Sequence, residues 1–136
     1  MIERTLLLEI TNQLKRKKSL LLLGPRQVGK TTLIKTLPFD LQINFALSRE
    51  RLIYEKNPDI IQQKIQSLKK QKNLKLPLVY IDEFQLVPQI MNEIQVLIDQ
   101  KEAQFVLTGS SARKLKESSQ INLAPGRFLN LRLDPL

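Results

Sequence analysis

Short apolar runs alternate with amphipathic segments along this chain, and that alternation predicts an α/β fold. Residues 1–18 repeat an apolar side chain at every fourth position from Ile2 to Leu14, which predicts a first helix. The leucine run at 20–23 predicts a strand that is buried on both faces, as a central parallel strand is.

The same alternation continues to the end of the chain. Helical patterns cover residues 30–37, residues 48–72 with a break at Pro58, and the segment after Pro88 with its apolar stripe of Ile90, Ile94, Leu97 and Ile98. Strand patterns cover residues 41–47, 76–81, 104–108 and 127–133, and the pattern at residues 110–117 predicts a short helix or turn. We therefore expect one domain over 1–136, with a parallel sheet and helices on both faces.

The segment between the first strand and the next helix reads GPRQVGKT, which fits the phosphate-loop pattern G-x-x-x-x-G-K-[ST]. Its position between a strand and a helix is the context that gives this pattern meaning. The candidate nucleotide-binding residues are Gly24, Pro25, Arg26, Gln27, Val28, Gly29, Lys30 and Thr31.

Each position of this loop has a physical task. Gly24 and Gly29 permit backbone angles that let successive N–H groups turn inward around a phosphate. The following helix adds the positive end of its dipole. Lys30 supplies a charge for the β- and γ-phosphates, and the Thr31 hydroxyl is placed to coordinate Mg²⁺.

Two adjacent acids, Asp82 and Glu83, end the apolar segment LVYI, which is the Walker B arrangement of phosphate-loop ATPases. Ligands of open parallel sheets bind at the carboxyl ends of the strands, so Asp82 is expected beside the loop. We expect Asp82 to hold Mg²⁺ and Glu83 to polarise the water that attacks the γ-phosphate.

Hydroxyl side chains follow the next strand, in the sequence LTGSS. If this strand lies between the other two, Thr108 or Ser110 is placed to sense the γ-phosphate. The alternative, which does not exclude the first, is an ordinary turn in which Ser110 or Ser111 caps a helix. Three arginines are candidates for neutralising phosphate charge: Arg127, Arg113 and Arg26. For Arg127, an ordinary role at a strand edge or in a salt bridge is favoured.

Composition narrows the chemistry. The chain has no cysteine and no histidine, which excludes disulfides, thiol nucleophiles and imidazole bases. No apolar run approaches the roughly 20 residues that span a bilayer, and the start lacks the features of a signal peptide, so we expect an intracellular, cytoplasmic protein without membrane partners. The net charge of +9 leaves nucleic-acid contact open, against solvated lysine-rich loops as the simpler interpretation.

Four motifs in order carry a resemblance to a known family: GPRQVGKTTL at 24–33, LVYIDEFQLVP at 78–88, FVLTGSSARKL at 105–115 and APGRF at 124–128. The chain resembles prokaryotic AAA-like ATPases, the "AAA domain" group usually joined to a DUF4143 C-terminal region. The resemblance implies a P-loop NTPase fold of the additional-strand (ASCE) type with a five-stranded parallel sheet. It also implies ATP as ligand, with Thr32 added to the nucleotide site.

Two departures from the family pattern bear on this expectation. Pro125 precedes Gly126 where the family has alanine, and the sequence stops at Leu136, where the family continues into its C-terminal region. The partner is therefore expected to be another protein or a separate C-terminal region.

Three functional hypotheses remain open at this point. The first is slow Mg²⁺-dependent ATP hydrolysis, the second is a nucleotide-dependent switch or truncated ATPase without useful catalysis, and the third is a basic nucleic-acid-binding protein whose loop holds a phosphate.

Overall fold

The computed structural model describes residues 4–24, 30–110 and 127–132. Its elements in chain order are α1 (Arg4–Lys15), β1 (Ser19–Leu23), α2 (Lys30–Thr36), β2 (Leu41–Asn44), α3 (Ser48–Lys56), α4 (Ile60–Lys72), β3 (Leu78–Asp82), the 3-10 turn η1 (Phe84–Leu86), α5 (Ile90–Asp99), β4 (Gln104–Gly109) and β5 (Phe128–Arg132).

The strands form one parallel five-stranded sheet in the order β2-β3-β4-β1-β5. Strand β4 lies between β1, which leads into the phosphate loop, and β3, which ends in the acids. The predicted parallel sheet with an additional strand between these two is therefore confirmed.

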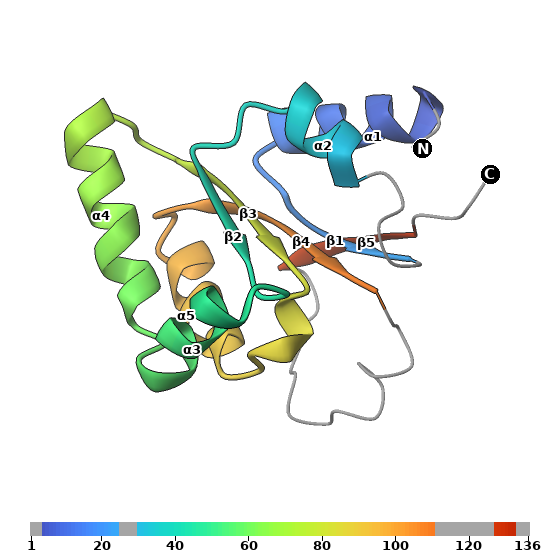
Figure 1. The fold of residues 1–136 in the computed structure, drawn as a ribbon. Coiled ribbons are helices and arrows are strands. Elements are labelled where there is room, and N and C mark those ends of the chain that lie inside the picture. The colour runs from blue at the N-terminus through green and yellow to red at the C-terminus, as the bar shows by residue number, and fades with distance from the viewer. Residues whose placement is uncertain (1–3, 25–29, 111–126, 133–136) are drawn as a thin grey trace.

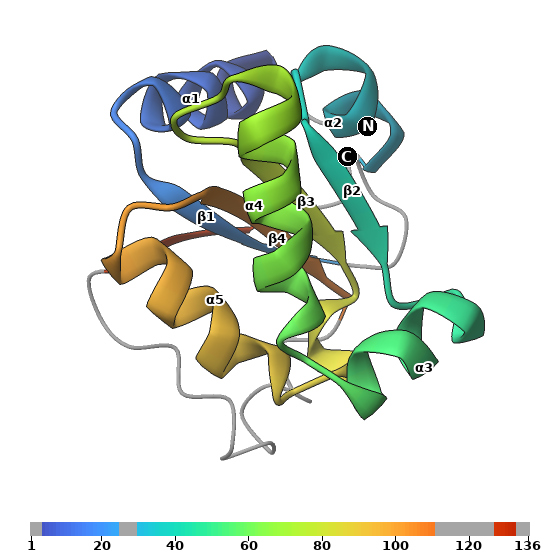
Figure 2. The ribbon, with the colours of Figure 1, turned by 90° about the vertical axis from the view of Figure 1, so that its left-hand side faces the viewer.

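Helices cover both faces of the sheet, with α1 and α2 on one side and α3, α4 and α5 on the other (Figures 1 and 2). Successive side chains of a strand point to opposite faces, so each strand contributes to two cores. Leu20, Leu22 and Tyr80 pack under α1 and α2, whereas Leu21 and Ile81 belong to the larger core under the other helices.

Several predicted boundaries were wrong by a few residues. The first helix ends at Lys15, since the chain turns at Lys17, whose φ of 64° is left-handed. Strand β2 ends at Asn44 and not at residue 47, because the Asn44 side chain accepts the Ala46 N–H at 2.9 Å and its carbonyl accepts the Leu47 N–H at 3.2 Å.

The third strand also differs from its prediction over 76–81. It begins at Leu78, after Pro77, which has no N–H to donate, and it extends to Asp82. The last strand begins at Phe128, one residue after its predicted start, and Leu133 at its predicted end lies outside the described residues. The predicted break of the long helical pattern near Pro58 separates α3 from α4. Of the predicted turn at 110–117, only Ser110 belongs to the described residues.

Within the described residues, no helix is both long enough and apolar enough to cross a membrane.

Candidate nucleotide site

Three strands end side by side at one rim of the sheet, which we call the carboxyl rim. Asp82 at the end of β3 pairs in register with Thr108 of β4, and Leu23 of β1 pairs with Gly109. The Gly24 N–H, at the start of the loop motif, donates to the Gly109 carbonyl at 3.2 Å. The start of the loop and the two acids therefore lie on the same rim.

A buried chain of hydroxyl groups holds Asp82. The Thr108 hydroxyl donates to Asp82 Oδ1 at 2.8 Å, and the hydroxyls of Thr108 and Tyr80 are 3.1 Å apart. Because the single Thr108 proton goes to the carboxylate, the Tyr80 O–H is the donor of the second bond. Burial, with a smaller contribution from the charges of Asp82 and Glu83, raises the pKa of Tyr80, which therefore remains a neutral donor.

Glu83 is held in a different way, at the start of the turn that follows β3. Its backbone is left-handed, with φ 54° and ψ 47°, and only 5% of the residue is exposed. Ser110 donates its N–H to Glu83 Oε1 at 3.0 Å and its hydroxyl to Oε2 at 3.1 Å. The Gln85 amide also donates to Oε1, at 3.2 Å. A non-glycine residue in this region costs about 1–3 kcal/mol, and such strain concentrates at functional sites.

Glycine at position 109 lets η1 approach the end of β4. A Cβ on Gly109 would lie 2.9 Å from Gln85 Oε1 and 3.1 Å from Phe84 Cε1. Both distances are closer than ordinary contacts, and the Phe84 ring is fully buried. The small residue therefore allows Ser110 to come within hydrogen-bonding distance of Glu83.

The remaining residues of the predicted nucleotide site are only partly described. Helix α2 begins at Lys30, Thr31 is exposed and Thr32 is half-buried. Pro25, Arg26, Gln27, Val28 and Gly29 lie outside the described residues, as does the side chain of Lys30.

Of the candidate arginines, Arg127 lies at the opposite end of the sheet from the two acids. It precedes β5, whose first residue, Phe128, pairs with Ser19 at the start of β1. Its guanidinium binds Asp99 through two bonds of 2.8 and 2.6 Å. This geometry bears out the salt bridge that the sequence favoured and removes Arg127 as a phosphate ligand within its own chain. Arg26 and Arg113 lie outside the described residues.

The rim has the chemistry that Mg²⁺ requires, although no group of three or more acidic side chains gathers anywhere in the described residues. Mg²⁺ is commonly bound by one or two carboxylates together with substrate phosphates, and not by a cage of protein ligands alone. Asp82 supplies a carboxylate that is 7% exposed and oriented by Thr108, and the exposed Thr31 supplies a hydroxyl on the adjacent helix. The residues present therefore fit a metal that arrives with a nucleotide.

A parallel sheet with a strand inserted between the loop strand and the acidic strand defines the additional-strand class of P-loop NTPases. The chain belongs to the AAA domain family, which matches it over residues 16–136. The resemblance read from the four motifs is thereby confirmed at the level of the family, and with it an ATPase-like, nucleotide-binding character. The link to a DUF4143 region remains a prediction. No match was found among curated proteins.

The residues that position the two acids were not predicted from the sequence. Tyr80 lies two positions before Asp82 and thus on the same face of β3, a signal that was available from strand periodicity. Gln85 was missed because the turn η1 has no strong sequence pattern. The contact between Ser110 and Glu83 depends on the left-handed backbone of Glu83, which no motif predicts.

Proposed function

We propose that the carboxyl rim binds Mg·ATP and that the domain hydrolyses it slowly. The observation that supports this most strongly is the convergence of Gly24, Asp82 and Glu83 on one rim, with the helix that begins at Lys30 beside them. The family assignment supports the same proposal independently.

In this proposal the residues from Gly24 to Thr32 surround the phosphates with backbone N–H groups, and Lys30 neutralises charge on the β- and γ-phosphates. Thr31 and Asp82 hold Mg²⁺. The bound ion would stabilise the charge that develops on the phosphate oxygens. Thr108 keeps the Asp82 carboxylate oriented, so it acts as a positioning residue.

Glu83 is proposed to accept a proton from the attacking water. A carboxylate has about four lone-pair positions, and Ser110 and Gln85 already donate three hydrogen bonds to it. We infer that the hydrogen bonds from Ser110 to Glu83 break when nucleotide binds. A carboxylate oxygen of Glu83 can then accept the proton of the attacking water. This step would make Ser110 the residue that links nucleotide occupancy to catalysis.

The test is the rate of phosphate release from ATP with Mg²⁺ for the wild type and for Glu83→Gln. Glutamine keeps the size of the side chain but is not a base, so the rate is expected to fall by about a hundredfold or more. An exposed acid of α1 provides the matched control, Glu9→Gln, which is expected to retain the wild-type rate. Equal nonzero rates in wild type and Glu83→Gln would remove Glu83 from this role.

A nucleotide-dependent switch without turnover is the second candidate function. The observation that favours it is the engagement of both Glu83 oxygens by Ser110, in a conformation that leaves the carboxylate little capacity to act as a base. Binding of Mg·ATP without phosphate release would support the switch.

The nucleotide itself is tested by thermal stabilisation. Ligand at 100 times its dissociation constant stabilises the folded state by about 2.7 kcal/mol, which raises the melting temperature of a domain of this size by roughly 10 °C. We expect Mg·ATP to reach this shift at lower concentration than Mg·GTP. An equal response to both nucleotides would contradict the proposed preference for ATP.

A further inference from the structure

The rim opposite the candidate nucleotide site collects positive charge. Helices run antiparallel to the strands that they connect, so α1, α4 and α5 all end at the rim where the strands begin (Figures 1 and 2). One basic cluster of the sequence lies at the end of α1 and another at the end of α4. We call the exposed cations there the basic edge, and they are the residues 15–18, Lys70, Lys72, Lys75 and Lys101.

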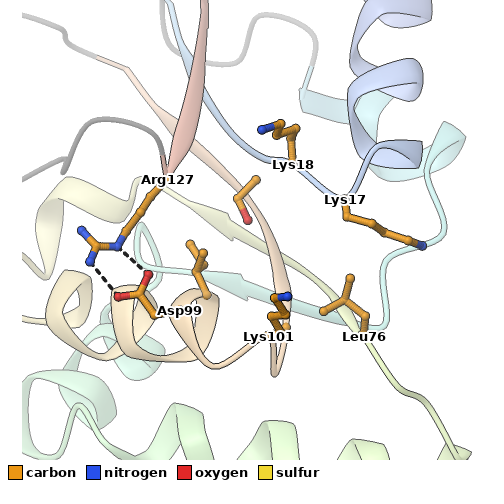
Figure 3. A pocket seen from close by; sticks show the side chains of 9 residues that line it. Lys17, Lys18, Leu76, Asp99, Lys101 and Arg127 are labelled. Carbon is orange, nitrogen blue, oxygen red and sulfur yellow. Dashed lines mark hydrogen bonds and ion pairs between the residues drawn. The ribbon is translucent and has the colours of Figure 1, made fainter.

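A pocket of about 440 Å³ lies within this edge. Lys17, Lys18, Lys101 and Arg127 line it together with Leu76 and other apolar or small residues. Figure 3 shows Lys18 and Lys101 beside the pocket and the Lys17 ammonium extending away from the pair of Arg127 and Asp99. The lysines that line this pocket therefore come from two segments of the chain, the turn after α1 and the residue that follows α5 by two positions.

Two of the acids near this edge, Asp99 and Glu102, have cationic partners, and a third, Asp40, precedes β2 at the same rim and accepts the Leu78 N–H at 2.8 Å. Asp99 binds Arg127 at the pocket wall, and Glu102 binds Lys69 at 2.7 Å and also accepts a bond from Gln66. These hydrogen bonds are the main reason that the pKa values of Asp99 and Glu102 are lowered, so both acids are ionised near neutral pH. Their charges are balanced by Arg127 and Lys69, neither of which is counted among the exposed cations of the basic edge.

The ends of helices do not account for this amount of charge. Each helix places roughly half a negative elementary charge at its C-terminus, so the four helices that end at this rim, α1, α2, α4 and α5, supply about two, and the Asp40 carboxylate adds one. The basic edge holds eight exposed cationic residues, all outside the two ion pairs just described. A large positive excess therefore remains for a ligand.

The turn that carries Lys17 and Lys18 is also fixed in place. The buried Gln104 side chain donates to the carbonyls of Leu14 and Lys18, both at 2.8 Å. Ser19 adds a bond from the Phe105 N–H at 3.0 Å. The backbone beneath these lysines is thus ordered before any ligand arrives, which lowers the entropic cost of binding.

We propose that the basic edge binds the phosphate backbone of nucleic acid. A polyanion matches a row of exposed lysines, whereas lysine is depleted at protein–protein interfaces, where aromatic and apolar anchors carry most of the affinity. None of the exposed large hydrophobic residues of the described structure belongs to the basic edge; they are Leu8, Leu47, Leu52, Ile53 and Val96. With no aromatic side chain lining the pocket, binding is expected to be independent of base sequence.

This surface is separate from the candidate nucleotide site. The five residues of β1 span about 15 Å between the two rims, so nucleic acid and nucleotide can be bound at the same time. Nucleic-acid binding at the basic edge can therefore be measured separately from ATP binding at the carboxyl rim.

The test is fluorescence anisotropy with a labelled duplex of about 20 base pairs and with its single strand, from about 50 to 300 mM NaCl. The triple variant Lys17→Gln, Lys18→Gln, Lys101→Gln removes charge from the pocket. The matched control is the triple variant Arg4→Gln, Arg49→Gln, Lys56→Gln, which also removes three positive charges but at exposed positions outside the basic edge.

We expect the pocket triple to raise the dissociation constant about tenfold or more and to reduce the slope of log K against log salt by about 2 to 3. The control triple is expected to change the slope by less than about 1. Circular dichroism is expected to give both triple variants the spectrum of the wild type and a melting temperature close to its own, which shows that they are folded.

Three results would overturn the proposal. The first is no binding of the wild type to either DNA at about 50 mM salt, and the second is an equal loss of affinity in both triples. The third is binding of a polyglutamate peptide of equal charge as tightly as DNA, which would indicate an acidic protein partner.

Discussion

Removal of the Thr108 hydroxyl is the perturbation that tests the geometry of the rim most closely. The hydroxyl donates to Asp82 at 2.8 Å and receives the Tyr80 O–H at 3.1 Å. Thr108→Val keeps the shape of the side chain but removes both bonds. In this variant the buried Tyr80 hydroxyl loses its hydrogen-bond acceptor, and Asp82 loses the hydroxyl that donates to it.

The magnitude follows from these two losses. A hydrogen bond to a charged group contributes about 1.5–3 kcal/mol, and a buried polar group left without a partner costs about 1–3 kcal/mol. Because the two terms share one hydroxyl and local relaxation recovers part of each, we expect a total loss of about 2–4 kcal/mol. That is a substantial share of the roughly 5–15 kcal/mol that stabilises an ordinary domain.

Urea denaturation of the wild type, Thr108→Val and Thr108→Ser measures this loss. Serine keeps the hydroxyl, so Thr108→Ser is expected to lose only the contribution of one methyl group, about 1 kcal/mol. Adding Tyr80→Phe to Thr108→Val removes the orphaned hydroxyl, and the double variant is expected to be more stable than additivity predicts by about 1–2 kcal/mol. Equal stability of the Val and Ser variants, with unchanged denaturant dependence, would refute the reasoning.

Three further predictions concern the same rim and the opposite one. Gly109→Ala places a methyl group 2.9 Å from Gln85 Oε1 and 3.1 Å from the Phe84 ring. The variant is expected to lower the unfolding free energy by about 1–3 kcal/mol, and an unchanged thermal midpoint would contradict this close approach. Ser110→Ala removes the hydrogen bond from the Ser110 hydroxyl to Glu83. We expect kcat for ATP to rise about threefold compared with Ser110→Thr, because one fewer hydrogen bond must break before Glu83 can accept a proton. Identical kcat values would contradict the inference that these bonds break during turnover. Arg127→Gln breaks the pair with Asp99 at the far rim; ATP turnover is expected to change by less than about twofold, whereas an arginine that neutralised phosphate charge would cost about a thousandfold.

The sheet and the position of its site could be predicted because the strands and the loop motif have strong sequence patterns of their own. The leucines of β1 and the run LVYI of β3 indicated buried parallel strands, and the position of the Asp82 carboxylate followed from the rule that parallel strands present their ligands at one edge. The place of β4 between them was a conditional expectation, made from the family resemblance, and the order of the strands confirms it.

The parts that were not predicted depend on contacts between distant residues. Strand β2 is shorter than its alternating pattern because the Asn44 side chain accepts the Ala46 N–H and turns the backbone out of the strand. The hold of Ser110 on Glu83 joins two turns that are 27 positions apart in the sequence. The basic edge was visible only as scattered lysine clusters until the antiparallel run of the helices brought their ends to one rim.

The central claim is that the loop before α2 and the Asp82 carboxylate hold one metal-bearing triphosphate between them. Isothermal titration of ATP with and without Mg²⁺, on the wild type, Lys30→Ala and Asp82→Asn, tests it directly. We expect Mg²⁺ to tighten binding of ATP to the wild type about tenfold or more, to have little effect on Asp82→Asn, and Lys30→Ala to bind ATP weakly in either condition. The same affinity and the same response to Mg²⁺ in all three folded proteins would contradict the account.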